Sequence, residues 1–534
     1  MKPLLDKRVV IKQLDINEPD IRLFKTKDVN DSLIWNFEYI LKTEKPEIDT
    51  VKKEFDWKIE CNKFNMTGGH INIQDSLKSS AEPSASLYPD RFNLNNFDIS
   101  NINIILSGLY SEEIKEFEIS KLNFKTNTQF NLNDFSANIK IADKSSTDIK
   151  SFKLTTDSTN ILINKAFIAG FDPFNFSNYE DMADYNVEFS LIADRFNVHD
   201  LKYFLPHLNF LNGKYFVKIE ANGKYNDITL QNLILNTDYT TININGKVKN
   251  LTAPEKLYLD VNLNESKIEP GDVKNCLPGI DIPDYSHVGT VYTDIKFTGE
   301  PLNFSSGIDI RTGSGNITGD VKLDLRNNNI SYKTDLFAKS INIGKIIKDD
   351  NLKSTINMNL KADGRGTDIN TLAGKFDFTI SNSEIYGQNI RAAKGIVTAN
   401  SMNFDIKLDY SSNTLTTNLE GKINLKNIKN PDYQLNGSVK SLDISTISHN
   451  TQDKSDLNFS FNIKGSGIDV DDVSGNYNFR IFPSIYGIYP IPETPLDLTF
   501  IKTEGIKSIT LASKFVDFKA EGNFKITSIP QILL

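Results

Sequence analysis

The sequence has few of the residues that commonly build redox or metal sites. Its 534 residues include 2 cysteines, 5 histidines and 2 tryptophans. Cys61 and Cys276 are far apart and form no Cys-x-x-Cys motif, so we expect two free thiols, with a single disulfide as the alternative. His199 and His207 lie close in sequence, but no carboxylate pair stands near them at ligand spacing. We therefore expect no metal site.

Catalytic signatures and long apolar runs are also missing. The chain contains no P-loop, no GxGxxG, no GxSxG and no HExxH motif, so we expect neither catalytic residues nor a cofactor. No stretch approaches the ~18 apolar residues of a membrane-spanning helix, and the first residues lack the apolar core of a signal peptide. The net charge of −9, with both signs interspersed, argues against a nucleic-acid partner.

What the chain does contain is apolar alternation. Hydrophobic residues make up 39% of it, enough to bury a large surface. In the stretch 457–464 (LNFSFNIK) every second residue is apolar, the pattern of a strand with one wet and one dry face. Many strands also carry a glycine in an apolar-face position, as Gly246, Gly319 and Gly421 do. Such a glycine leaves a notch in the face or permits a bend or bulge.

Short helices interrupt this pattern. An aspartate that could act as N-cap, an apolar side and a closing proline predict a helix over 200–205, with Asp200 as the cap, and the same pattern recurs over 272–277. Looser versions predict helices over 342–348 and 443–448.

The chain also repeats itself at an offset of 101 residues. The residues Gly364, Gly366, Asp368, Gly374, Phe378 and Ile380 match Gly465, Gly467, Asp469, Gly475, Phe479 and Ile481. We interpret this as a duplication of a unit of strands and one short helix. The expected organisation is an N-terminal β region (1–192), β-groove repeats with short helices (193–350), and duplicated repeats (351–534, with copies at 359–425 and 460–526).

In the first region, residues 11–75 indicate strand pairs joined by short polar turns, and the Ser/Pro-rich stretch 78–90 indicates a loop. The proline-rich stretch 481–495 interrupts the second copy and is expected to lie at the rim of the sheet.

These patterns predict an all-β fold: an elongated, curved, mostly antiparallel sheet with a hydrophobic groove and a few short helices. An array of this kind can curl and leave a channel instead of a filled core. An ordinary sandwich core is the alternative for the same residues. The groove residues we expect are Ile242, Ile244, Val248, Phe376, Phe378, Ile380, Phe404, Ile406, Leu408, Phe459, Phe461, Ile463, Phe479, Phe518 and Phe524.

Several segments resemble the AsmA-like family and its TamB-type members. Residues 16–23 (INEPDIRL), the pair 35–36 (WN) and residues 64–75 (FNMTGGHINIQD) resemble the opening of AsmA-like proteins. The module 200–251, with DLKYFLP, NGKYFVKIEANG and TTININGKVKNL, is similar to TamB-type repeats. The resemblance covers most of the chain and depends on pattern and order.

This resemblance implies a β-taco: a long sheet folded around an apolar groove. It also implies an inner-membrane anchor, a periplasmic body, and a role in moving phospholipid to the outer membrane or in helping outer-membrane proteins assemble. No anchor precedes this body, so we expect the sequence to be a fragment or to begin at a misassigned start. The expected partners are phospholipid or another acyl lipid, and outer-membrane assembly proteins. We also expect contact with a membrane, either through the ends of the body or through a missing anchor.

The leading hypothesis is thus a non-enzymatic lipid conduit. The first alternative is a structural or adhesive β-solenoid with a filled interior, but the unequal spacing of the recurring glycines favours an open sheet. The second is a polysaccharide-active β-helix enzyme, which would need carboxylates or basic residues clustered on one face.

Overall fold

A computed structural model describes residues 7–27, 33–38, 57–75, 96–128, 130–142, 146–173, 179–203, 211–279, 281, 283–503 and 505–528. It divides into two compact units. Unit 1 comprises Met1–Ser286 and Thr290–Glu300, and unit 2 comprises His287–Gly289 and Pro301–Leu534. The expected loop at 78–90 lies outside the described residues. The three-part division of the chain stays a prediction.

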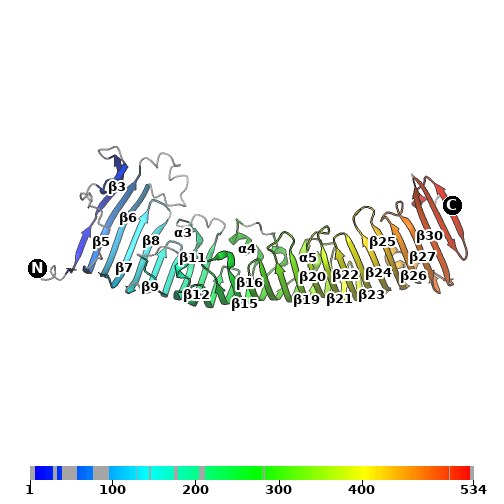
Figure 1. The fold of residues 1–534 in the computed structure, drawn as a ribbon, viewed down its shortest axis with the longest axis horizontal. Coiled ribbons are helices and arrows are strands. Elements are labelled where there is room, and N and C mark those ends of the chain that lie inside the picture. The colour runs from blue at the N-terminus through cyan, green and yellow to red at the C-terminus, as the bar shows by residue number, and fades with distance from the viewer. Residues whose placement is uncertain are drawn as a thin grey trace. The chain divides into compact units, whose positions relative to one another are not determined.

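Unit 1 is an open sheet of strands that mostly follow one another in chain order (Figure 1). Its described strands are β1 (Arg8–Ile11), β2 (Leu14–Asn17), β3 (Asp20–Lys27), β4 (Leu33–Trp35), β5 (Lys58–Gln74), β6 (Asn96–Tyr110), β7 (Ile114–Thr126), β8 (Asn131–Ala142), β9 (Ser146–Thr156), β10 (Asn160–Ala169), β11 (Asn186–Asn197), β12 (Lys214–Lys224), β13 (Asp227–Asn236), β14 (Thr241–Lys249), β15 (Tyr258–Ile268) and β16 (Val291–Glu300). Its helices are η2 (Tyr179–Met182), α3 (Val198–Lys202), η4 (Pro254–Lys256) and α4 (Pro270–Cys276).

Unit 2 is built in the same way and is antiparallel throughout its described pairings. Its strands are β17 (Asn303–Thr312), β18 (Gly315–Asp324), β19 (Ser331–Ile341), β20 (Ser354–Arg365), β21 (Ala373–Ile385), β22 (Gln388–Asn400), β23 (Asn403–Ser412), β24 (Thr416–Asn424), β25 (Asp432–Leu442), β26 (Ser455–Ser466), β27 (Ser474–Ile481), β28 (Ser484–Tyr486), β29 (Tyr489–Ile491), β30 (Thr494–Thr503), β31 (Ile506–Ser513) and β32 (Asp517–Gly522). Its helices are η5 (Ser286–Val288, which begins at the last residue of a unit 1 segment), α5 (Ile343–Ile347), α6 (Ser445–Ser448), η6 (Thr451–Asp453) and η7 (Ile526–Ser528).

The prediction of an all-β, curved, open and mostly antiparallel sheet with a few short helices is therefore confirmed. The exception to antiparallel order lies at the start of unit 1. There β1, β2 and β3 each pair in parallel with successive parts of β5. The expectation that strands in 11–75 pair with their sequence neighbours was wrong for β1 and β2, whose described pairings are with β5. It is correct for β3, which forms a hairpin with β4 in addition to its parallel pairing with β5. The alternation of apolar and polar residues within a strand specifies which of its faces is dry, but it does not specify which other strand it pairs with.

The alternating pattern sets the register of unit 2. In β23, Phe404, Ile406 and Leu408 are half-buried, while Asp405 and Lys407 between them are exposed. An antiparallel ladder places directly opposed residues on one face. Ile406 and Leu408 oppose residues of β22 that in turn oppose Phe376 and Phe378 of β21, so these apolar residues share one face, as the sequence predicts.

The recurring glycines are needed for close contact between strands. Gly319 and Gly421 have φ values of +140° and +154°, a region that side chains with a Cβ rarely adopt. A Cβ at Gly421 would overlap the Gln434 carbonyl oxygen of the next strand, and one at Gly319 would overlap that of Asp335. The pairing at both glycines continues without a register shift, so they are not bulges.

All four predicted short helices are present, as α3, α4, α5 and α6. The first two differ in their caps. In α4 the N-cap position is held by Glu269, without a side-chain hydrogen bond, and Asp272 lies in the first turn, so this helix begins at Pro270, two residues earlier than predicted. Asn197 is the N-cap of α3, and its side chain accepts from the His199 N–H, so Asp200 lies in the first turn. Asp200 instead accepts hydrogen bonds from Thr156 at 2.5 Å and Ser158 at 2.9 Å, which attach the helix to the β9–β10 turn. The helix therefore begins two residues earlier than predicted, and residues 204–205 lie outside the described part.

The duplication is visible in repeated hydrogen bonds at the predicted offset of 101. The Ile343 N–H donates to Ser354 Oγ at 2.7 Å, and the Ile444 N–H donates to Ser455 Oγ at 2.7 Å. At the same offset, the Asn357 N–H donates to Ser383 Oγ and the Asn458 N–H donates to Ser484 Oγ. Gly364 likewise opposes Gly374 across two strands, as Gly465 opposes Gly475. The two copies thus share these hydrogen bonds from backbone N–H groups to serine hydroxyls, as well as their sequence pattern.

The proline-rich stretch 481–495 folds as a small hairpin of β28 and β29. β28 pairs with the first residues of β26, at the end of the sheet, so the expected rim position is correct. The main sheet resumes with β30, where Pro495 opposes Arg480 of β27.

Candidate functional site

The candidate site is the dry face of unit 2, which we call the apolar face. It is defined by rows of directly opposed residues that cross the strands. One row contains Ile308, Gly319, Leu336, Leu360, Phe378, Gly395, Leu408, Leu419, Gly437, Phe461, Phe479 and Leu496. The neighbouring row contains Ser306, Val321, Thr334, Ala362, Phe376, Val397, Ile406, Gly421, Leu435, Ile463, Tyr477, Leu498, Leu511 and Phe518. Few polar residues interrupt these two rows.

The apolar face is not packed as a core. Its large side chains, such as Phe461, Ile463 and Leu408, are half-buried, and its fully buried members are mostly alanines. Within the described residues, the strands of unit 2 contact mainly their hydrogen-bonded neighbours and short helices, and no second sheet covers them. A face of this kind has apolar area left to bury, because half-buried side chains keep part of their surface in water.

Aromatic rings on the face lie over glycines of the neighbouring strand. The Phe461 ring covers Gly437, where an added Cβ would come within 2.5 Å of the ring, and the Phe378 ring covers Gly395. Phe459 and Phe479 add an edge-to-face contact with ring centroids 6.0 Å apart. The notch expected at a face glycine is thus filled by an aromatic ring at Gly437 and Gly395, whereas at Gly246, Gly319 and Gly421 the backbone of the next strand occupies the space.

The structure brings most predicted groove residues together. Phe376, Phe378, Ile380, Phe404, Ile406, Leu408, Phe459, Phe461, Ile463, Phe479 and Phe518 all lie on the apolar face of unit 2. Phe524 follows β32 and belongs to no strand, so no pairing assigns it to this face. Whether these residues carry a ligand stays a prediction.

Ile242, Ile244 and Val248 lie on β14, on the equivalent dry face of unit 1. That face has its own apolar row, formed by Phe152, Ile163, Leu191, Ile219, Leu233, Ile244, Leu263 and Ile295. Unit 1 differs in having a small packed cluster of buried side chains, made by Phe130, Leu132 and Tyr203.

Sequence reasoning missed a polar pair on the apolar face. The hydroxyls of Tyr433 and Tyr477 lie 2.6 Å apart and hydrogen-bond each other. Burial raises the pKa of the Tyr477 hydroxyl, and the bond to Tyr433 raises it further, so the Tyr477 hydroxyl stays a neutral donor and acceptor near pH 7. The signal was present in the duplication, since Tyr477 occupies the place that Phe376 has in the first copy.

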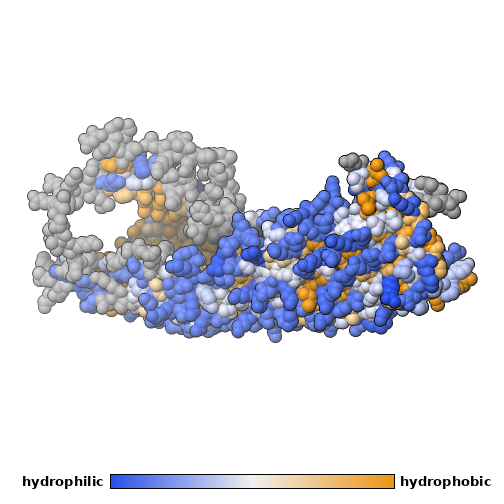
Figure 2. Space-filling model, turned by 45° about the vertical axis from the view of Figure 1, so that its right-hand side comes forward, coloured by the Kyte–Doolittle hydropathy of each residue, from blue (hydrophilic) through white to orange (hydrophobic). Residues whose placement is uncertain are grey.

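The opposite face of the sheet is wet. Exposed ion pairs cross its strands, for example Lys333 with Asp363 at 3.1 Å and Lys361 with Asp335 at 3.0 Å. Figure 2 shows hydrophilic residues over much of the side of the molecule in view, with hydrophobic patches between them. Exposed pairs of this kind contribute little stability and mainly keep the surface soluble.

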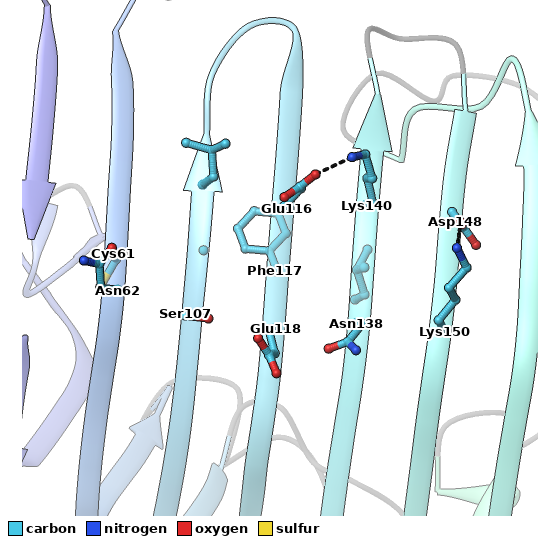
Figure 3. Close-up of a pocket in the computed structure, with 13 residues that line it drawn as sticks. Cys61, Asn62, Ser107, Glu116, Phe117, Glu118, Asn138, Lys140, Asp148 and Lys150 are labelled. Atoms are coloured by element: carbon cyan, nitrogen blue, oxygen red, sulfur yellow. Dashed lines mark ion pairs between the residues drawn. The ribbon is translucent and has the colours of Figure 1, made fainter. Parts of the chain in front are cut away.

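A hollow of about 540 Å³ in unit 1 is a second candidate (Figure 3). Its charged residues stand on β7, β8 and β9, and four of them form two ion pairs. Glu116 lies 2.5 Å from Lys140, and Asp148 lies 2.8 Å from Lys150 and raises the pKa of that ammonium group. Such pairing is typical of the wet side of a sheet, and it gives the hollow no distinctive chemistry.

The two cysteines, Cys61 and Cys276, are free thiols, which confirms the expectation. Among the residues that the structure describes, no group of three or more His, Cys, Asp and Glu side chains could hold a metal ion. No helix of that same part of the chain is long and apolar enough to cross a bilayer. Comparison with protein-family models, curated proteins and solved structures finds no match.

Proposed function

We propose that this protein is a non-enzymatic carrier of phospholipid or another acyl lipid, with the acyl chains lying on the apolar face of unit 2 and on the equivalent face of unit 1. The observation that carries the proposal is the continuity of the apolar rows across consecutive strands, with large side chains that stay half-buried. A filled β-solenoid fits less well, because each unit is an open sheet in its described part.

The energetics suit transport. Burying apolar surface contributes ~25 cal/mol per Å², so an acyl chain along several strands gains several kcal/mol without a specific pocket. Neighbouring positions in a row are chemically similar, so a chain can shift from one to the next without leaving apolar surroundings. The hydroxyls of Tyr433 and Tyr477 are polar groups on the face that could meet a lipid ester.

The resemblance to AsmA-like and TamB-type proteins supports a setting for this activity. It favours a periplasmic body that conducts lipid between the inner and outer membranes and takes part in outer-membrane assembly.

Photocrosslinking tests the proposal with adjacent positions on one strand. Leu408 points to the apolar face and Lys407 to the wet face of β23. A photoreactive amino acid at Leu408 should capture lipid in cells, and the same residue at Lys407 should not. Equal capture at both positions, or no capture at either, would contradict the proposal, and mass spectrometry of the captured lipid would identify its class.

A charge placed on the face is the matched functional test. In an open groove, Phe461→Asp should leave the protein folded, because the carboxylate can reach water, and should block lipid passage. Asn462→Asp places the same charge on the exposed side of the same strand and should leave lipid capture unchanged. Global unfolding of the Phe461 variant would show that this face is a closed core.

A further inference from the structure

The β28–β29 hairpin exposes apolar side chains to an unusual degree. Ile488 is 85% exposed, Tyr489 is 68% exposed and Ile485 is 49% exposed. The turn is tight, with Gly487 at φ +59°, as a two-residue hairpin loop requires. An exposed cluster of this size marks an interaction surface more often than it marks a neutral tip.

The base of this hairpin is held firmly. Its first strand pairs with β26 at Ser455 and Asp456, and the Tyr486 hydroxyl donates to Asp453 Oδ1 at 2.8 Å. The Gly487 N–H donates to the Lys454 carbonyl at 2.8 Å. The apolar tip is therefore presented in a fixed orientation at the end of the sheet, and little ordering would be needed when it binds.

The duplication shows which apolar residues the second hairpin has gained. The matching hairpin of the first copy joins β21 to β22, and the backbone bond from Tyr386 to Lys353 matches that from Gly487 to Lys454. At the same offset, Glu384, Gly387 and Gln388 of the first copy become Ile485, Ile488 and Tyr489 in the second. The first hairpin exposes Tyr386 (64%) at its turn, between polar residues, so the second hairpin carries a larger exposed apolar cluster than its counterpart.

A second turn at the same end of the strands has changed in the same direction. The β31–β32 turn carries Phe515, 63% exposed, and Val516, 58% exposed. The first copy has Thr414 in place of Phe515 and the apolar Leu415 in place of Val516, in a turn closed by the matching bond from Ser412 to Leu415, so the change toward apolar at this turn is that of Phe515. Strand directions place this turn at the same end as the hairpin, and β30 and β31 separate the two by ~10 Å.

We propose that these two turns together dock unit 2 onto a lipid bilayer by inserting into its interfacial layer. Aliphatic side chains, tyrosine, phenylalanine and a flanking lysine are the residues that such layers favour. Two separate convex tips would bury far less than the ~1,200–2,000 Å² of a stable protein interface, whereas insertion of a few side chains suffices for reversible membrane attachment. The docking does not depend on lipid being carried on the apolar face.

The test is co-sedimentation of the whole protein with phosphatidylcholine vesicles, with and without phosphatidylglycerol. The variant Ile485→Glu/Ile488→Gln/Tyr489→Gln should bind at least ~tenfold more weakly, because it removes the apolar area that would insert. The control is Ile468→Thr, which restores the first-copy residue at a side chain that is 69% exposed at the opposite end of the strands. It should bind vesicles like the unchanged protein.

Hydrogen exchange gives an independent readout. Residues 484–491 and 513–517 should become protected when vesicles are added, and residues 467–473 should not. Equal binding by the hairpin variant and the unchanged protein would overturn the proposal, as would equal loss in the Ile468 variant. Self-association through the hairpin without vesicles, seen by light scattering and lost in the hairpin variant, would also overturn it in favour of a second copy. Lipid capture at Leu408 is scored separately, so either proposal can fail alone.

Discussion

Truncating Phe461 to alanine measures directly whether the apolar face is open. A fully buried phenylalanine costs about 3–5 kcal/mol when truncated, through lost burial and the cavity left behind. Phe461 is half-buried, with one side of its ring on Gly437. Its truncation should therefore lower the free energy of local unfolding by about half as much, roughly 1.5–2.5 kcal/mol.

The assay is hydrogen exchange of the β25–β27 amides under conditions that report the free energy of opening, since a long array need not unfold in a single step. The control is Phe130→Ala in unit 1, where the side chain is 5% exposed within the packed cluster. That variant should show the full core cost in the strands around it. If Phe461→Ala costs as much as Phe130→Ala, the face is covered and the reasoning for an open groove fails.

Two further predictions concern other parts of the fold. Gly421→Ala should destabilise unit 2 by about 1–3 kcal/mol, because it places a Cβ at positive φ against a backbone oxygen, whereas Gly307→Ala, with no atom nearer than 3.5 Å to an added Cβ, should be almost neutral by urea titration. In unit 1, hydrogen bonds to Asp98 and Asp20 raise the pKa of His70 above its ordinary 6.5. The protonated imidazole therefore stabilises the β3–β5–β6 edge below about pH 6.5, and this contribution should disappear as the pH rises through the raised pKa, which NMR titration of His70 with hydrogen exchange of β3 would follow.

The sequence predicts those features of the fold that short-range patterns determine. Alternation in β23 specifies which side chains are dry, and the same alternation in β21 specifies that Phe376 and Phe378 share a face with Ile406 and Leu408. The short helices follow from capping and proline signals, although the cap itself moved to Asn197. Which strands pair with each other could not be predicted in the same way, because the parallel pairing of β1, β2 and β3 with β5 depends on contacts between segments distant in sequence.

The candidate site was predictable in its composition and less so in its chemistry. An apolar residue at every second position predicts a dry face, but only the three-dimensional arrangement shows that the face stays half-buried. The duplication shows that a tyrosine, Tyr477, replaces Phe376, but not that its hydroxyl bonds to Tyr433, because the two residues are distant in sequence and meet across β26, which lies between their strands.

The two copies separate what the fold requires from what it leaves free. The hydrogen bonds that attach each short helix to the following strand recur in both copies. Ser354 accepts one from the Ile343 N–H and Ser455 accepts one from the Ile444 N–H, both at 2.7 Å. Turn residues have instead changed from polar to apolar, as from Gln388 to Tyr489 and, at the opposite end of the strands, from Thr367 to Ile468. An exposed apolar side chain contributes little to folding, since it gains no burial there. The hairpin of the first copy exposes Tyr386 at its turn, whereas that of the second exposes Ile485, Ile488 and Tyr489. This larger cluster is better explained by contact with a bilayer than by the stability of the sheet.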